Sequence, residues 1–508
     1  MSSSNSDTPR PNIVLIMTDQ QRADLCGREG YPLDVTPFVD RLARAGVDFR
    51  CAYTAAPVCA PARVSTLTGR FPSAHRVREN RGHEHVYYSR DLVDVVRGLG
   101  YATALVGKNH SHLTPERVDH AFLLSHDAGY SSKSHTSDDE RAFDEWIHRL
   151  NHRTAIEPTP FPVESQSCSR AVSDAIQWID GLTGGKERKP FFLWLSFPEP
   201  HNPYQVPEPY FSMFSPESIP PARTGRETLQ AKGFKWELTR QLGEYVYSDY
   251  EEQLERSRPI YLGTLRMIDD QIARFVSHLE KTGMRENTLI IFMSDHGDFV
   301  GEYGLMRKGP EMPELLMRVP LVFSGPGVSG PRVEERFVSI VDILPTLCEL
   351  LGAPLPAGVQ GRSLLPVLRG GEVPPDELRS IYAEQGYGGL HYDEHDAIDF
   401  DHCTIPGPVD RSFDELNTYS QSGTMRMVRK GKWKLVQDMQ GRGQLYDLEH
   451  DPLELENCYE DPGCREVRAE MTEELLTWLL RMQDPLPHPV NKYRIKLHPR
   501  NYWTDPGQ

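Results

Sequence analysis

Asn12-Ile-Val-Leu-Ile-Met-Thr18-Asp19-Gln20 predicts a buried strand that delivers polar residues at its carboxyl end. Three later apolar runs, at 101–106, 191–196 and 289–293, have the same form, and 320–323 predicts a further strand. Helical patterns occupy 37–46, 91–99, 165–182 and 256–279, the first with Thr36 as its expected N-cap. Residues 338–351 predict a helix interrupted by Pro345. This alternation predicts an α/β fold, a large mixed sheet between layers of helices.

The sequence pattern changes after about residue 368, where paired glycines and prolines indicate a linker. We expect a main domain over 1–372 and a smaller one over 373–508. Short alternating runs at 425–428, 433–436 and 444–447, followed by a helical pattern at 467–482, predict a short antiparallel sheet with a helix. The tail 485–508 has no helical period, so we expect either an arm that packs on another subunit of a homo-oligomer or a tail lying on its own domain.

Composition narrows the class of protein. The 508 residues carry 56 basic and 73 acidic side chains, a net charge of −17, which disfavours general nucleic-acid binding. No apolar run approaches the ~18 residues of a membrane helix, and the apolar stretch 13–17 is too short for the core of a signal peptide. We therefore expect a cytoplasmic protein that contacts no membrane. Eight cysteines without a CxxC pair disfavour a disulfide scaffold or a structural zinc site.

The ends of the four predicted strands carry residues that suit an active site. They are followed by Asp19-Gln20, by Lys108-Asn109-His110, by His201, and by Asp295-His296. Each of these residues alone is typical of a turn or a helix cap. Ligands of open α/β sheets, however, bind outside the carboxyl ends of the strands, so the four together indicate a functional site there.

A second signal is Cys59-Ala-Pro61-Ala-Arg63. Proline suits the first turn of a helix, which places Cys59 at a helix N-terminus, where free N–H groups favour an anion or an ionised nucleophile. Arg63, one turn further on, can reach the same point. A buried inert cysteine and an ordinary catalytic thiol are the alternatives that the residues leave open.

These motifs carry a family resemblance. Cys59-x-Pro61-x-Arg63 followed by Leu67-Thr68-Gly69-Arg70 resembles the signature of the formylglycine-dependent sulfatases, members of the alkaline phosphatase superfamily. Similar to that family, in the same order, are Gly107-Lys108-x-His110, Pro200-His201-Asn202-Pro203, Ser294-Asp295-His296-Gly297-Asp298 and Gln360-Gly361-Arg362-Ser363. Lys308, thirteen residues after Asp295, matches an active-site lysine of the family. The resemblance covers nearly the whole chain, and it implies an alkaline phosphatase-like fold.

The resemblance also implies a mechanism. Cys59 would be oxidised to formylglycine by a formylglycine-generating enzyme, and its hydrated aldehyde would attack sulfur. One divalent metal ion would be held by Asp19, Gln20, Asp295 and His296 together with residue 59. The remaining roles would fall to cationic and histidine side chains: charge neutralisation by Arg63, Lys108 and Lys308, protonation of the leaving alcohol by His201 or Lys308, and removal of a diol proton by His110.

Two positions depart from the commonest sulfatase pattern, in which a second Asp replaces Gln20 and Asn replaces His296. The Gln and His version resembles choline-sulfatase-like and phosphonate monoester hydrolase-like branches. Hard calcium prefers oxygen ligands whereas imidazole suits manganese, so both ions stay open, with calcium favoured. Lys108 and His110 form the sulfatase-type pair, which favours sulfate monoesters over phosphonate monoesters or phosphodiesters.

Other features leave alternatives. Asn80 resembles a substrate-binding asparagine of these branches, although a loop asparagine is as often a turn residue. A non-catalytic anion-binding or metal-binding protein on the same fold is the rival from another class. The identity of the leaving group, whether aryl, alkyl, choline or sugar, is not encoded in any motif that the sequence displays.

Overall fold

The computed structural model describes residues 10–80, 82–126, 137–183, 189–389, 391–396 and 422–483. An eight-stranded mixed sheet forms its centre, in the order β5-β4-β6-β1-β7-β8-β2-β9. The strands are β1 (Asn12–Asp19), β2 (Val47–Phe49), β4 (Ala102–Gly107), β5 (His120–Leu123), β6 (Phe191–Pro200), β7 (Thr288–Ser294), β8 (Leu321–Ser324) and β9 (Arg332–Glu334). The predicted α/β class with a large mixed sheet is confirmed.

The pairing of the central strand β1 with its neighbours determines which strand ends lie together. It is buried along its whole length and pairs in parallel with β6 on one side and β7 on the other, while β6 pairs in parallel with β4. The strand β8 then runs antiparallel to β7, which makes the sheet mixed. Because β4, β6, β1 and β7 are parallel neighbours, their carboxyl ends meet at one edge of the sheet.

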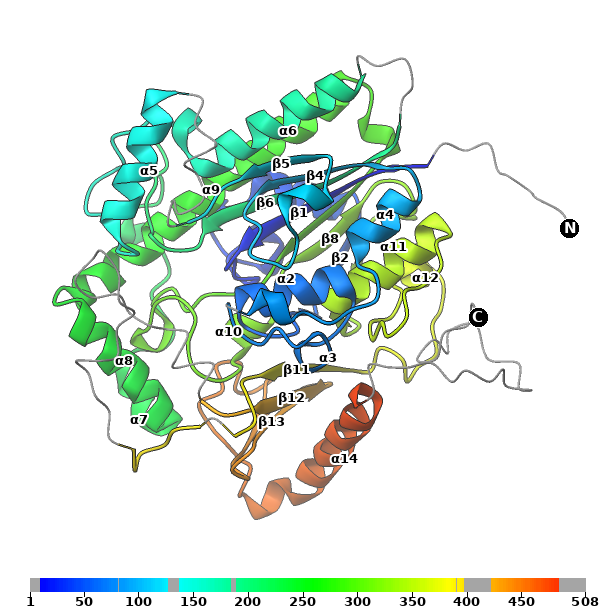
Figure 1. The fold of residues 1–508 in the computed structure, drawn as a ribbon. Coiled ribbons are helices and arrows are strands. Elements are labelled where there is room, and N and C mark those ends of the chain that lie inside the picture. The colour runs from blue at the N-terminus through cyan, green and yellow to red at the C-terminus, as the bar shows by residue number, and fades with distance from the viewer. Residues whose placement is uncertain are drawn as a thin grey trace, which may run out of the picture.

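Successive residues of β1 point to opposite faces, and each face is covered by helices (Figure 1). Ile13, Leu15 and Met17 pack with α2 (Cys59–Thr68), α4 (Leu92–Gly98) and α11 (Ile343–Leu351). Val14 and Ile16 pack with α1 (Pro37–Arg44), α6 (Ser167–Thr183) and α9 (Tyr250–Lys281). The shorter elements are α3 (Pro72–His75), α5 (Asp138–Leu150), α7 (Leu229–Lys232), α8 (Phe234–Val246), α10 (Glu314–Met317), α12 (Leu365–Leu368) and the parallel pair β3 (Ala52–Tyr53) and β10 (Val338–Ser339).

The C-terminal part forms the predicted antiparallel sheet and helix. Its strands are β11 (Ser380–Gln385), β12 (Met425–Lys430), β13 (Trp433–Asp438) and β14 (Gly443–Asp447), and α14 (Arg465–Met482) covers one face. The ring of Trp478 stacks on Tyr382 at 5.7 Å between centroids. Both rings belong to the same hydrophobic cluster as Leu344 of α11, so the small sheet shares a core with the large one. The expected arm, 485–508, lies outside the described residues.

Three details of the sequence interpretation are wrong. Thr36 occupies the expected N-cap position, with Pro37 first in α1, but its side chain does not cap the helix, because the N–H groups of Phe38 and Val39 donate to the carboxylate of Asp269 in α9, at 2.7 and 2.8 Å. Pro345 does not interrupt a helix, since α11 begins at Ile343 and so places the proline in its first turn, where no N–H is needed. The long helix α9 begins at Tyr250, not Arg256, and continues through Pro259 because its early turns are also packed.

None of the described helices combines the length and apolar composition that crossing a bilayer requires.

The Asp269 contact yields a stability prediction. Replacing Asp269 with Ala leaves two N–H groups at the start of α1 without their acceptor in a buried setting, which should lower the free energy of unfolding by about 2 kcal/mol. Asp269→Asn retains one acceptor oxygen and should lose less. Urea unfolding and amide hydrogen exchange of Phe38 and Val39 measure both effects, and unchanged exchange at these amides in Asp269→Ala would contradict the capping role.

Candidate active site

The residues predicted at the strand ends do lie near one another in space. Asp19 ends β1, Lys108 follows β4, His201 follows β6, and Asp295 with His296 follows β7. The N-terminus of α2 brings Cys59 to the same place, under the edge of the sheet where these strands finish. The site is thus assembled from segments almost 280 residues apart in the chain.

Four potential metal ligands form the centre of the site. One donor atom from each of Asp19, Cys59, Asp295 and His296 lies within 4.8 Å of the others, and all four residues are completely buried. The Sγ of Cys59 lies 3.1 Å from His296 Nε2 and 3.6 Å from Asp19 Oδ1. His296 Nδ1 lies 2.8 Å from the carbonyl oxygen of Gly297, which directs Nε2 into the site. Two carboxylates and an imidazole around residue 59 suit a divalent cation.

Gln20 lies beside this group, and hydrogen bonds to its side-chain amide fix its orientation. Its backbone is left-handed (φ 72°), and its Nε2 donates to Oδ2 of Asp298, which also accepts from the Tyr204 hydroxyl at 2.6 Å. With Nε2 held in this way, Oε1 faces Lys308 Nζ at 3.4 Å. Asp298 stands in the motif Ser294–Asp298, but the motif alone indicates no role for it. Its short spacing from Asp295 was the signal that could have found it.

Arg63 ties the carboxylates together. From the second turn of α2, its Nε donates to Asp295 at 2.8 Å and one terminal nitrogen donates to Asp19 at 3.2 Å, with all three side chains fully buried. The other terminal nitrogen donates to the Ser196 hydroxyl at 2.8 Å. The guanidinium that the resemblance assigned to the sulfuryl group therefore contacts the carboxylates and a hydroxyl.

Two lysines, Lys108 and Lys308, contact members of the ligand cluster. Lys108 Nζ forms an ion pair with Asp19 and lies 3.0 Å from His126 Nδ1. Lys308 Nζ lies 3.7 Å from Cys59 Sγ and 3.5 Å from His201 Nε2. Of these two lysines, Lys308 is the one that contacts both Cys59 and His201. An ammonium group in this position can stabilise negative charge that develops beside residue 59.

Burial and these neighbours shift the ionisation of the site. Burial raises the pKa of Asp19, but Lys108, Arg63 and His296 outweigh it and hold that pKa well below its usual range. Burial and Asp19 raise the pKa of Asp295. Burial and Asp19 also raise the pKa of Cys59, yet Lys308, Lys108 and His296 together lower it to about 6. Burial, His126 and Lys308 hold the pKa of His201 well below its usual range, so its imidazole is neutral.

Asn80 and His110 reach the site through the start of α2. The Oδ1 of Asn80 accepts from the N–H of Ala60 at 3.0 Å, which supplies the side-chain cap that Val58 lacks. The ring of His110 lies 3.3 Å, through Nε2, from the carbonyl oxygen of Asn80. Burial, Lys108 and Arg63 lower the pKa of His110 to about 3. Asn80 thus connects His110 to the helix that carries Cys59.

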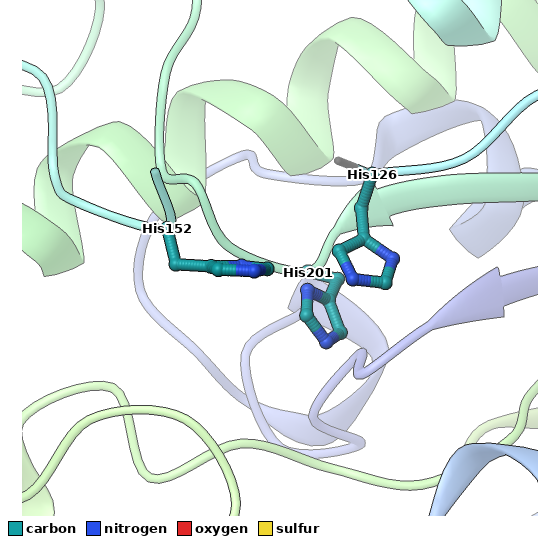
Figure 2. Close-up of side chains that lie close together, drawn as sticks. All are labelled: His126, His152 and His201. Carbon is teal, nitrogen blue, oxygen red and sulfur yellow. The ribbon is translucent and has the colours of Figure 1, made fainter. Parts of the chain in front are cut away.

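Sequence reasoning missed two residues next to His201. His126 and His152 flank α5 in a region that displayed no recognisable motif, yet their rings lie 4.0 and 6.3 Å from that of His201 between centroids (Figure 2). His152 has a left-handed backbone (φ 63°), as does the preceding Asn151 (φ 45°). Neither histidine lies on a periodic element whose face could be predicted, so only the folded loops bring them to the site.

Comparison with known proteins agrees with this geometry. The family model described as Sulfatase matches residues 11–353. A choline-sulfatase of Rhizobium meliloti is 30% identical and aligns over 92% of this chain and 85% of its own. A multifunctional alkaline phosphatase superfamily protein of Trinickia caryophylli is 28% identical over 94% of this chain and 96% of its own. The crystal structure of a phosphonate monoester hydrolase of Agrobacterium radiobacter superposes with a TM-score of 0.76 at 26% identity, covering 93% of this chain and 96% of that one.

The ligand cluster predicts metal binding that depends on its carboxylates. Asp295→Asn keeps the shape of the side chain but removes a negative charge from the cluster, so the purified protein should hold far less divalent metal than wild type. Metal analysis of dialysed protein measures this, with Asp174→Asn, a carboxylate paired with His120 outside the site, as control. Equal metal content in wild type and Asp295→Asn would rule out this cluster as the metal site.

Proposed function

The chain belongs to the sulfatase family, and we propose that it hydrolyses aryl or alkyl sulfate monoesters to the alcohol or phenol and sulfate. The observation that carries this proposal is the environment of Cys59. It stands at the N-terminus of a buried helix, among two carboxylates and an imidazole, with Lys308 3.7 Å away. This arrangement combines a nucleophile position, a set of metal ligands and cations for an anionic ester.

The residues present fit the metal ion and the formylglycine that are general in the sulfatase family. We propose that Asp19, Gln20, Asp295 and His296 hold one divalent metal ion together with residue 59. When bound, that ion supplies charge neutralisation and lowers the pKa of an oxygen nucleophile. His296 contributes nitrogen, which suits manganese, while the oxygen ligands suit calcium, the ion we favour. We further propose that a formylglycine-generating enzyme converts Cys59 to the aldehyde whose hydrate supplies the nucleophile.

Side chains of the chain itself would provide charge neutralisation and proton transfer. Lys108 and Lys308 neutralise the sulfuryl oxygens as charge builds up during attack. The leaving oxygen takes its proton from Lys308 or from His201, whose Nε2 lies 3.5 Å from Lys308 Nζ. His201 is neutral, so it can pass on a proton that it receives from Lys308. Arg63 keeps the carboxylates in place. Asn80 caps the start of α2, at the end of the helix that faces the substrate.

His110 serves the second half of the reaction. Burial, Lys108 and Arg63 lower its pKa to about 3, so the imidazole is neutral and has a ring nitrogen with a lone pair. That nitrogen would take the proton of the second hydroxyl of the nucleophile as sulfate is expelled. Its Nε2 lies 3.3 Å from the carbonyl oxygen of Asn80, the residue that caps the helix carrying Cys59.

A second candidate activity is hydrolysis of phosphonate monoesters or phosphodiesters with the same side chains. It is favoured by the similarity to the phosphonate monoester hydrolase and by the Gln20 and His296 pair. The ratio of kcat/KM on matched aryl sulfate and aryl phosphonate monoesters distinguishes the two. We expect the ratio to favour the sulfate, and a ratio that favours the phosphonate would transfer the assignment to the second activity.

The position of Lys308 predicts a large effect on rate. Lys308→Ala removes a cation from the developing anionic charge and should lower kcat/KM by about 100- to 1,000-fold. Lys108→Ala should act in the same direction, because its ammonium is paired with Asp19 in the site. Steady-state kinetics measure the loss and thermal unfolding shows that the fold persists. Lys281→Ala, at the far end of α9, is the matched control, and near-wild-type turnover in Lys308→Ala would remove the lysine from the mechanism.

The proposed nucleophile predicts a modification. Active protein should carry formylglycine at residue 59, and its occupancy, measured by peptide mass analysis, should track specific activity across preparations. Cys59→Ala should fold without turning over substrate, while Cys26→Ala, a buried cysteine outside the site, should remain active. Fully active protein with only an unmodified Cys59 would instead indicate a thiol nucleophile.

We also propose that the tail 485–508, which lies outside the described residues, is an arm that joins subunits of a homo-oligomer.

A further inference from the structure

We propose that His126, His152 and His201 form a second metal site, which binds a borderline divalent transition-metal ion such as zinc and inhibits the enzyme. One ring nitrogen from each histidine lies within 4.8 Å of the other two. Figure 2 shows the three side chains converging from separate loops. The cluster contains no carboxylate, and an all-imidazole set favours zinc, copper or nickel over calcium.

One residue, Asn202, orients two of the three rings. His201 Nδ1 lies 2.5 Å from the carbonyl oxygen of Asn202, so this nitrogen carries the proton and Nε2 keeps its lone pair. The side-chain amide of Asn202 lies 3.0 Å from His152 Nδ1. Hydrogen bonds that fix the nitrogen opposite the ligand atom are characteristic of metal-binding histidines.

The amide of Asn202 can also set His152 for metal binding. Its Oδ1 is buried and has no hydrogen-bond partner among the residues that the structure describes. Rotating the amide by half a turn presents this oxygen to Nδ1–H of His152, which leaves Nε2 of that ring with a lone pair. The rotation gives the orphaned oxygen a partner, so the ligand-ready tautomer costs no hydrogen bond.

The backbone conformation at Asn151 and His152 supports a ligand-binding role for His152. Asn151 and His152 are consecutive left-handed residues, neither of them glycine, at the end of α5. Such conformations are unfavourable and persist where surrounding structure holds them, often at ligand sites. Tetrahedral zinc with Zn–N distances of about 2.1 Å brings its nitrogens to about 3.4 Å from one another, so the loops close slightly on the ion.

Two ammonium groups limit the affinity of this site. Lys108 Nζ lies 3.0 Å from His126 Nδ1, and Lys308 Nζ lies 3.5 Å from His201 Nε2. An ion bound to the histidines must displace these contacts and sit near two positive charges, so the site fills at raised zinc concentration and does not hold a resident ion. Filling it removes His201 from proton transfer and separates it from Lys308. This inhibitory consequence rests on the proposed function, whereas the binding site itself does not.

The binding test uses zinc chloride and the full-length protein with its own resident metal. In calorimetric titration, wild type should bind one zinc ion more than His152→Ala does. His278→Ala, which removes a histidine paired with Asp180 outside the site, should bind as wild type. His152→Gln provides a second variant should the alanine fail to fold. Equal zinc stoichiometry in wild type and a folded His152 variant would overturn the proposal.

The activity test separates the site from the proposed function. Zinc should inhibit wild type, and His152→Ala should raise the half-inhibitory zinc concentration at least 10-fold with uninhibited kcat/KM within 2-fold of wild type. Inhibition unchanged by His152→Ala would refute the inhibitory role even if the ion binds. A protein that hydrolyses no sulfate ester would fail the proposed function while the calorimetric result still decides the site.

Discussion

The buried ion pair of Arg63 with Asp19 and Asp295 is the constraint on which the site depends. The three side chains come from α2 and from the ends of β1 and β7, and none is exposed. Removing one partner of such a group leaves an uncompensated buried charge, at a cost of about 3–5 kcal/mol. The pair therefore fixes how α2 lies against the strand ends. Because Cys59 stands one turn before Arg63, the same contact places Cys59, the proposed nucleophile position, among the carboxylates.

Several positions around the site have backbone conformations that the fold alone would avoid. Gln20, His110 and His152 are left-handed, with φ of 72°, 43° and 63°. Each costs on the order of 1–3 kcal/mol and is held by contacts such as that of Asp298 with Gln20. Gln20 then contacts Asp298 and Lys308, while His110 lies beside Asn80 and His152 beside His201. These conformations lower the free energy of unfolding in exchange for the placement of polar groups. The packing of the sheet offsets this cost.

Much of this arrangement could be predicted from local sequence, and the exceptions share one cause. The buried strand at 12–18, the helix start at Cys59 and the polar residues after each strand are signals carried by adjacent residues. Asp269, which caps α1, lies more than 200 residues away from it. His126 and His152 belong to no periodic element, and β11 became a strand only by pairing with β12. The sequence does not predict which residues become contact partners when distant parts of the chain pack together.

Charge alone does not choose between the two activities that this site supports. Arg63, Lys108 and Lys308 oppose the carboxylates of Asp19 and Asp295, so the side chains leave a surplus of positive charge even before a divalent ion is added. Sulfate monoesters and phosphonate monoesters both carry one negative charge at neutral pH, and the surplus attracts them alike. Gln20, which is neutral where Asp is common, increases this surplus without changing its sign. Discrimination must therefore come from the transition state, where the lysines meet the charge that develops on the non-bridging oxygens. In the proposed reaction, the position of Lys308 beside residue 59 and His201 makes it the lysine that meets this charge at the leaving oxygen.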